Sequence, residues 1–347
     1  MCTKRQETGV KVDSSFSFGD QLDDIDDIKR RYAEFEKQEF DGVVTAEIQN
    51  DPFLVVGMGA DATNKVELRT GIAVAFARSP MTTAYTAHDL NAFSKGRFTL
   101  GLGSQIKPHI TKRFSMPWHG PAKQMGEFIR AMHAIWDCWY DGEPLSFRGD
   151  CYHHTLMTPD FSPKNTQYGR PKVVMAAVGP LMIKTAAAVA DGIIIHTFGT
   201  QKYIEERILP GIDKTLAENS RSRDDFDVSF PPFVVTGQNE EEFEAAKAQV
   251  RYRLSFYAST PAYKPVLECH DWQDLQPKLN HLSKNNGWDK MPELISDEML
   301  ETFAVVGEPL QVAEQIKGRY GKLVDRITLE NNLPTELLQQ QMAIIKG

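Results

Sequence analysis

The sequence has few cysteines and no long apolar run. It contains four cysteines among 347 residues, and Cys2, Cys138, Cys151 and Cys269 lie far apart without a C-x-x-C pair. This spacing argues against a disulfide framework or a zinc knuckle and is typical of a reduced compartment. No stretch approaches the roughly 18 apolar residues that cross a bilayer, and the first ten residues lack the apolar core of a secretory signal. We therefore expect a cytoplasmic protein with no membrane partner.

The chain also has fewer basic residues than acidic residues. The chain has 39 Lys and Arg against 47 Asp and Glu, which gives a formal net charge of -8, and the basic residues form no stripe. Such a chain repels a nucleic-acid backbone, so we expect a small-molecule substrate and no nucleic-acid partner. With 41% hydrophobic residues the chain can bury a large core, which excludes a disordered protein.

Short apolar runs rich in Val, Ile and Phe recur along the chain, and most precede a stretch of helical periodicity. The predicted strands cover residues 10–16, 42–46, 67–75, 97–102, 172–176, 192–196, 232–236 and 325–330. Eight strand-helix units are typical of a (β/α)₈ TIM barrel, although a doubly wound open sheet also alternates strands and helices. We predict the α/β class and a single barrel domain over residues 1–347.

Helix signals and two interruptions complete this prediction. Asp51-Pro52, Ser79-Pro80 and Gly179-Pro180 each place a cap residue before a proline at a helix start. Apolar residues at three- and four-residue intervals predict helices over residues 21–36, 122–140 and 240–257. Two insertions break the rhythm: residues 141–170, after the fourth strand and with a predicted hairpin, and residues 260–304, before the last strand. Long loops in compact domains often bind ligands, so we expect the insertions to select the substrate.

Three motifs follow one another from the end of the third predicted strand to the end of the fourth. They are Arg78-Ser79-Pro80, Ser94-Lys95-Gly96-Arg97-Phe98 and Gly101-Leu102-Gly103. In this order the motifs resemble the luciferase-like monooxygenase superfamily of flavin- and deazaflavin-dependent oxidoreductases, whose fold is a (β/α)₈ barrel with insertions. Further matches span nearly the whole chain: Phe40-Asp41-Gly42-Val43, Ala176-Ala177-Val178-Gly179 and Val306-Gly307-Glu308-Pro309. The resemblance is strongest to the coenzyme F420-dependent branch.

The resemblance implies a cofactor, F420 or alternatively FMN, at the carboxyl ends of the barrel strands. Family members carry a non-prolyl cis peptide in the third strand, and Gly71-Ile72 is the matching dipeptide. The segment from Ala177 to Gly179 leads into a helix whose positive dipole end stabilises a phosphate. The implied cofactor-binding residues are Glu47, Gly71, Ile72, Val74, Lys107, His109, Ala177, Val178 and Gly179. No metal site is expected, because the adjacent His153 and His154 cannot readily converge on one ion.

The group that moves a proton is the open question at this site. Ile48 stands where several family members have an acid-base histidine, so the proton must come from elsewhere. The candidate catalytic residues are Glu47 after the second strand, His109 after the fourth and His196 at the end of the sixth. A histidine near its ordinary pKa can pass a proton at neutral pH, although either histidine could instead be structural.

The expected function is therefore hydride transfer between F420 and a small organic substrate, by a homodimeric enzyme. A luciferase-like monooxygenase that uses reduced FMN and O₂ is the first alternative within the same fold. A non-catalytic flavin-binding barrel is the alternative of another class, and the missing histidine at position 48 keeps it open.

Overall fold

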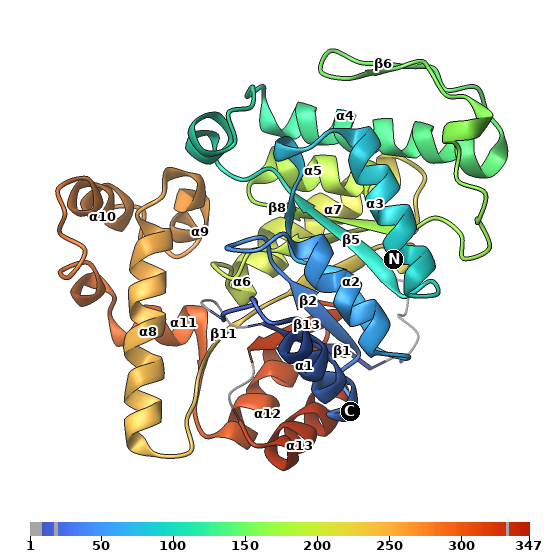
Figure 1. Ribbon diagram of the computed structural model, residues 1–347. Coiled ribbons are helices and arrows are strands. Elements are labelled where there is room, and N and C mark those ends of the chain that lie inside the picture. Colours follow the sequence, from blue (N-terminus) through green and yellow to red (C-terminus); the bar gives the residue numbers. More distant parts are fainter. Residues whose placement is uncertain (1–8, 17–19, 331–332) are drawn as a thin grey trace. The chain divides into compact units, whose positions relative to one another are not determined.

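The computed structural model describes residues 9–16, 20–330 and 333–347 (Figure 1). Within these ranges nine strands form one sheet in the order β3-β2-β1-β13-β10-β9-β8-β5-β4, and a pairing of β3 with β5 closes it. The strands of this sheet are β1 (Lys11–Ser15), β2 (Gly42–Thr45), β3 (Glu67–Thr70), β4 (Ala73–Val74), β5 (Phe98–Gly103), β8 (Lys172–Ala177), β9 (Gly192–Ile195), β10 (Asp227–Phe230) and β13 (Arg326–Glu330). Because β3 and β4 both pair with β5 in parallel, they are two halves of one barrel strand. The fold is the predicted (β/α)₈ barrel.

The prediction for the seventh strand was wrong. The barrel strand is β10, whereas most of the predicted segment 232–236 forms β11 (Phe233–Val235), which pairs with β12 (Ala304–Val306) in a separate two-stranded sheet. The reason lies in Pro231-Pro232, which separate β10 from β11 and cannot donate ladder hydrogen bonds. The sequence Asp-Val-Ser-Phe of β10 also carries a weaker apolar signal than Phe-Val-Val.

The helices begin close to the predicted cap residues. Asp51 caps α2 by accepting the Phe53 N–H at 2.9 Å, and Ser79 caps α3 by accepting the Thr82 N–H at 3.1 Å. The longer helices are α1 (Ile25–Lys37), α2 (Pro52–Ala62), α3 (Pro80–Phe93), α4 (Pro121–Trp136), α5 (Pro180–Val189), α7 (Leu209–Glu218), α8 (Glu240–Ala258), α10 (Leu275–Lys284), α12 (Pro309–Tyr320) and α13 (Thr335–Lys346). None of the helices in the described ranges combines the length and apolarity needed to cross a bilayer.

The described chain divides into two compact units. We call Asp13–Ala177 with Lys184–Ile194 the N-terminal unit, and the described part of Met1–Val12 with Val178–Ile183 and Ile195–Gly347 the C-terminal unit. The expectation of one domain over residues 1–347 stays a prediction.

The first insertion belongs to the N-terminal unit and contains the predicted hairpin. Its strands β6 (Phe147–Arg148) and β7 (His153–His154) pair antiparallel, and the segment is green in Figure 1. The hairpin is attached to α4 through the buried carboxylate of Glu127, which accepts the Cys151 N–H at 2.7 Å. The insertion is thus anchored to a barrel helix.

The second insertion belongs to the C-terminal unit and is largely helical. It contains the short turn η7 (Pro261–Tyr263), α9 (Lys264–Glu268), α10, the turn η8 (Pro292–Leu294) and α11 (Asp297–Phe303). In Figure 1 the orange helices α9 and α10 lie beside the end of α8. The Ser259 carbonyl at that end accepts hydrogen bonds from Gln276 Nε2 at 2.9 Å and Asn280 Nδ2 at 3.0 Å. Helix α10 therefore satisfies a carbonyl that α8 leaves without an intrahelical partner.

Arg97, the arginine of the Ser94–Phe98 motif, has a structural role. Its guanidinium donates to the carbonyls of Thr63 at 2.8 Å and Val66 at 2.7 Å, and its Nε donates to the Ser94 carbonyl at 2.8 Å. These carbonyls lie at the end of α2, before β3 and at the end of α3. One side chain thus fixes three chain segments around the start of β5.

Candidate functional site

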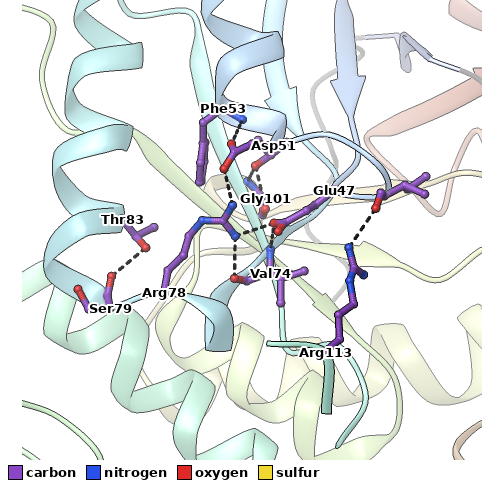
Figure 2. Close-up of polar contacts among 11 residues, drawn as sticks. Glu47, Asp51, Phe53, Val74, Arg78, Ser79, Thr83, Gly101 and Arg113 are labelled. Carbon is purple, nitrogen blue, oxygen red and sulfur yellow. Dashed lines mark hydrogen bonds and ion pairs between the residues drawn. The ribbon is translucent and has the colours of Figure 1, made fainter. Parts of the chain in front are cut away.

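Glu47 follows β2 and is bonded to the segment that joins β3 and β4. Its backbone N–H donates to the Ile72 carbonyl at 3.0 Å. Its carboxylate oxygen Oε2 accepts the Val74 N–H at 2.7 Å and an N–H of Arg78 at 2.6 Å (Figure 2). Only 8% of the Glu47 side chain is exposed, so these bonds are shielded from water. The carboxylate fixes the backbone at the carboxyl ends of β2 and β4.

Arg78 completes this arrangement, which we call the Glu47–Arg78 latch and define as Glu47, Asp51, Val74 and Arg78. Besides Glu47, the Arg78 guanidinium binds the Val74 carbonyl at 3.1 Å and Asp51 Oδ2 at 2.9 Å. It lies 5.0 Å from the centre of the Phe53 ring. Sequence reasoning missed the latch. The Arg-x-Pro motif and the Asp51 cap were both visible in the sequence, but nothing in their spacing shows that they meet.

The dipeptide Gly71-Ile72 is cis, as the family resemblance implies. The preceding residue, Thr70, exchanges hydrogen bonds with Gly101 of β5: Oγ1 donates to the Gly101 carbonyl and accepts the Gly101 N–H, both at 2.8 Å. A Cβ atom at position 101 would stand 1.8 Å from the Thr70 carbonyl oxygen, so only glycine fits. This close approach explains the first glycine of the Gly101-Leu102-Gly103 motif.

The loop after β5 approaches the loop after β2 through Arg113. Arg113 Nη2 donates to the Ile48 carbonyl at 3.2 Å, and a dashed line marks this contact at the labelled Arg113 in Figure 2. Lys107 and His109, both predicted cofactor contacts, are exposed on this loop, and His109 begins the short turn η2 (His109–Arg113). No hydrogen bond engages the His109 ring among the described residues. The roles predicted for Lys107 and His109 remain predictions.

Ala177 ends β8, and Val178 and Gly179 lead from it into α5. Gly179 has φ +79°, a left-handed conformation that favours glycine. Apart from Gly179 and its two chain neighbours, no described residue has an atom within 4 Å of the position that a Cβ atom would take there. The start of α5 therefore has open space beside it as well as the positive end of the helix dipole. An anionic group has room at this point, and the phosphate role of Ala177, Val178 and Gly179 stays a prediction.

His196 follows β9 in the C-terminal unit, inside a cluster of aromatic side chains. Its Nδ1 accepts the Phe198 N–H at 3.0 Å, and its Nε2 lies 3.0 Å from the Tyr263 hydroxyl. The Tyr257 ring stands edge-on to the imidazole, with ring centroids 4.7 Å apart. Burial, reinforced by the positive charge of Arg253, lowers the pKa of His196 to about 4. At pH 7 the imidazole is therefore neutral and has no extra proton to donate.

Three comparisons place the chain among known proteins. A family model described as luciferase-like monooxygenase matches residues 2–326. An uncharacterized protein of Mycobacterium tuberculosis is 47% identical over 292 residues, which cover 84% of this chain and 86% of that protein. The 5,10-methylenetetrahydromethanopterin reductase of Archaeoglobus fulgidus is 27% identical over 260 residues, 73% of either chain.

Solved structures agree with these matches at the level of the fold. The coenzyme F420-dependent tetrahydromethanopterin reductase of Methanopyrus kandleri has a TM-score of 0.75 to this chain at 21% identity, covering 96% of this chain and 97% of that one. The fold, the ordered motifs and the family match agree, and the chain belongs to the luciferase-like monooxygenase family.

Proposed function

We propose that this protein is an F420-dependent oxidoreductase that transfers a hydride between the deazaflavin and a small organic substrate. The cofactor supplies the redox chemistry, and the protein supplies binding, orientation and a water-poor site. The relatives from Archaeoglobus fulgidus and Methanopyrus kandleri support a reductase, and the second of them is named as F420-dependent. Reduced FMN with O₂, the route of a monooxygenase, is the alternative that the family description favours.

The Glu47–Arg78 latch is the observation on which we base the proposal. It fixes the backbone that follows β2 and the backbone around β4 at the carboxyl ends of these strands, where barrel enzymes bind their ligands. In the proposed site, the ring of the cofactor rests against Gly71, Ile72 and Val74. Glu47 acts chiefly by positioning this backbone, because its Oε2 is already bonded to Val74 and Arg78.

The remaining proposed contacts bind the cofactor tail. Ala177, Val178 and Gly179 hold a phosphate at the start of α5, where the structure leaves open space. Lys107, exposed on the loop after β5, neutralises negative charge, and His109 on the same loop donates the proton that a reduced carbonyl oxygen needs.

Cofactor titration tests the proposal directly. Purified protein is titrated separately with F420 and with FMN, and binding is followed by fluorescence quenching. Saturable F420 binding is the expected result. FMN binding without F420 binding would overturn the F420 assignment, and oxidation of bound reduced FMN by air would then test the monooxygenase alternative. Binding of neither would refute both.

A matched pair of variants tests the phosphate contact. Asn tolerates the left-handed conformation of position 179, so Gly179→Asn and Gly179→Asp differ mainly in charge. We expect Gly179→Asp to bind F420 at least about tenfold more weakly than Gly179→Asn, because a carboxylate at the phosphate site is worth about 1.4 kcal/mol or more of repulsion. Equal affinities of the two variants would place the phosphate elsewhere.

A second pair of variants tests the proton donor. His109→Ala should lower turnover with a carbonyl substrate when F420 is saturating, so that a change in F420 affinity does not enter the result. His119→Ala, a change at another exposed histidine that follows the same loop, is the control and should leave turnover unchanged. Equal turnover of wild type and His109→Ala would exclude His109 as the donor.

We also propose that the protein is a homodimer of the cytoplasm. Exposed apolar side chains on two neighbouring barrel helices, Leu54 of α2 and Phe93 of α3, support a covered face, with 69% and 66% of these residues exposed in the single chain. Cys138, Cys151 and Cys269 are free thiols, which suits a reducing compartment. Light scattering after size-exclusion chromatography measures the oligomeric state, and a monomer would refute the dimer.

A further inference from the structure

Tyr263 belongs to the second insertion and is bound to a residue at the end of a barrel strand. It is half-buried in the turn η7, and its hydroxyl lies 3.0 Å from His196 Nε2, directly after β9. The Tyr263 ring packs obliquely on the imidazole with centroids 4.6 Å apart and lies 5.6 Å from the Phe198 ring. Among the described residues, His196 is the one hydrogen-bond partner of the Tyr263 hydroxyl.

The direction of this hydrogen bond follows from the other ring nitrogen. His196 Nδ1 accepts the Phe198 N–H, so Nδ1 carries a lone pair and no hydrogen. A neutral imidazole then carries its hydrogen on Nε2, and this N–H donates to the Tyr263 oxygen. The hydrogen of the Tyr263 hydroxyl must therefore point away from His196, toward an acceptor that the described residues do not supply.

We infer that Tyr263 donates this hydrogen bond to an oxygen atom of the substrate, with His196 as the residue that orients it. The inference rests on the proposed function, because it assigns a substrate contact of the proposed oxidoreductase. It names an uncharged organic molecule with a carbonyl or hydroxyl oxygen as the ligand class.

The chemistry of the cluster favours a neutral acceptor over an ion. Burial raises the pKa of Tyr263 above its ordinary value, so the hydroxyl keeps its hydrogen at every pH at which the enzyme works. The neutral His196 adds no charge, and the rings of Phe198, Tyr257 and Tyr263 supply an apolar wall. A hydrogen bond in such a place orients the substrate oxygen. It rejects an analogue that lacks the oxygen, because the hydroxyl would then be left unpaired.

Nuclear magnetic resonance of tyrosine labelled with ¹³C at Cζ tests the contact without turnover. The chain has ten tyrosines, and the Tyr263 resonance is the one that disappears in Tyr263→Phe. The probes are cyclohexanone, which carries an acceptor oxygen, and methylenecyclohexane, which has nearly the same shape and no acceptor. We expect cyclohexanone to shift the Tyr263 resonance saturably and methylenecyclohexane to leave it in place. Equal shifts with both probes, or no shift with cyclohexanone, would overturn the inference.

Affinity for cyclohexanone gives the second measurement. Tyr263→Phe should bind it about tenfold more weakly, the equivalent of about 1.4 kcal/mol for one lost hydrogen bond in a shielded place. Tyr252→Phe, a change at an exposed tyrosine of α8, is the matched control and should bind like wild type. A Tyr263→Phe affinity within about twofold of wild type, less than the value of one hydrogen bond, would overturn the inference.

Two substitutions of His196 separate orientation from packing. A glutamine places an N–H near the position of Nε2, whereas an asparagine reaches only the position of Nδ1. His196→Gln should therefore retain more affinity for cyclohexanone than His196→Asn, and equal losses would refute the orienting role.

All these measurements are made with and without F420. Failure of F420 binding with an intact Tyr263 shift would refute the proposed function and leave the Tyr263 contact standing.

Discussion

Replacing Arg78 by methionine should destabilise the fold, because it leaves the Glu47 carboxylate without its cationic partner. The Glu47 side chain is 8% exposed and that of Arg78 is 18% exposed, so water replaces the lost partner poorly. Methionine keeps an apolar side chain of similar length and removes the guanidinium, together with its contact with the Phe53 ring. The substitution thus removes the charge and hydrogen bonds of the latch and keeps most of the apolar volume of the side chain.

The expected loss follows from the contacts of the guanidinium. Breaking a fully buried ion pair costs about 3–5 kcal/mol, and the Val74 N–H continues to bind Glu47, which reduces the loss. The bond to Asp51 adds little, because 43% of that side chain is exposed and surface pairs contribute about 0–1 kcal/mol. We therefore expect the free energy of unfolding to fall by about 2–3 kcal/mol.

Urea unfolding at pH 7, followed by tryptophan fluorescence, measures this loss. Arg130→Met is the matched control, because Arg130 is an exposed arginine of α4 with no ion pair among the described residues, and it should change stability by less than about 0.5 kcal/mol. In a double-mutant cycle, Glu47→Gln and Arg78→Met should be coupled by more than about 1 kcal/mol. If Arg78→Met is as stable as Arg130→Met, or if the coupling is absent, the latch does not hold this part of the barrel.

Three further predictions concern stability. Burial lowers the pKa of His196 to about 4, so the imidazole takes up a proton in the unfolded state before it does so in the folded state as the pH falls below about 6.5. The free energy of unfolding should therefore drop by up to about 3 kcal/mol toward pH 4, and His196→Gln should lack this loss. Gly101→Ala should fail to give folded protein by circular dichroism, whereas Gly318→Ala, in open space on α12, should fold normally. Burial raises the pKa of Glu36, but hydrogen bonds from the N–H groups of residues 64–66 outweigh it and lower the pKa; its stabilisation should therefore be present at neutral pH, fade in acid and be absent in Glu36→Gln.

The barrel could be predicted because each of its units carries its own local signal. Apolar runs mark the strands, and the Asp51 and Ser79 caps mark helix starts, so chain-local patterns suffice for most of the sheet. The prediction failed at β10, where Ser229 interrupts the apolar pattern. The run Phe-Val-Val, which follows the two prolines, has the stronger apolar signal and was therefore assigned to the barrel. Pairing between distant segments, such as β11 with β12, has no local signal at all.

Only the parts of the site that belong to sequence motifs could be predicted. The resemblance pointed to Glu47 and to Gly71-Ile72, and both lie where the latch is formed. The bond from Arg78 to Glu47 joins residues 31 positions apart, and the contact of Tyr263 with His196 joins residues 67 positions apart. Neither is visible without the fold, since side-chain pairs across long separations leave no periodicity in the sequence.

The Glu47–Arg78 latch and the aromatic cluster around His196 constrain where the proton of the proposed reaction comes from. Hydride transfer to a carbonyl carbon leaves an alkoxide that needs a proton, whereas hydride transfer to a cationic carbon needs none. Glu47 is engaged by Arg78, and His196 is neutral at pH 7 with both ring nitrogens in hydrogen bonds. His109 is the exposed candidate whose ring no described hydrogen bond engages. In the proposed reaction a carbonyl substrate therefore takes its proton from His109, from the Tyr263 hydroxyl that we infer to contact its oxygen, or from solvent. A slower His109→Ala enzyme with such substrates alone would identify the loop after β5 as the route.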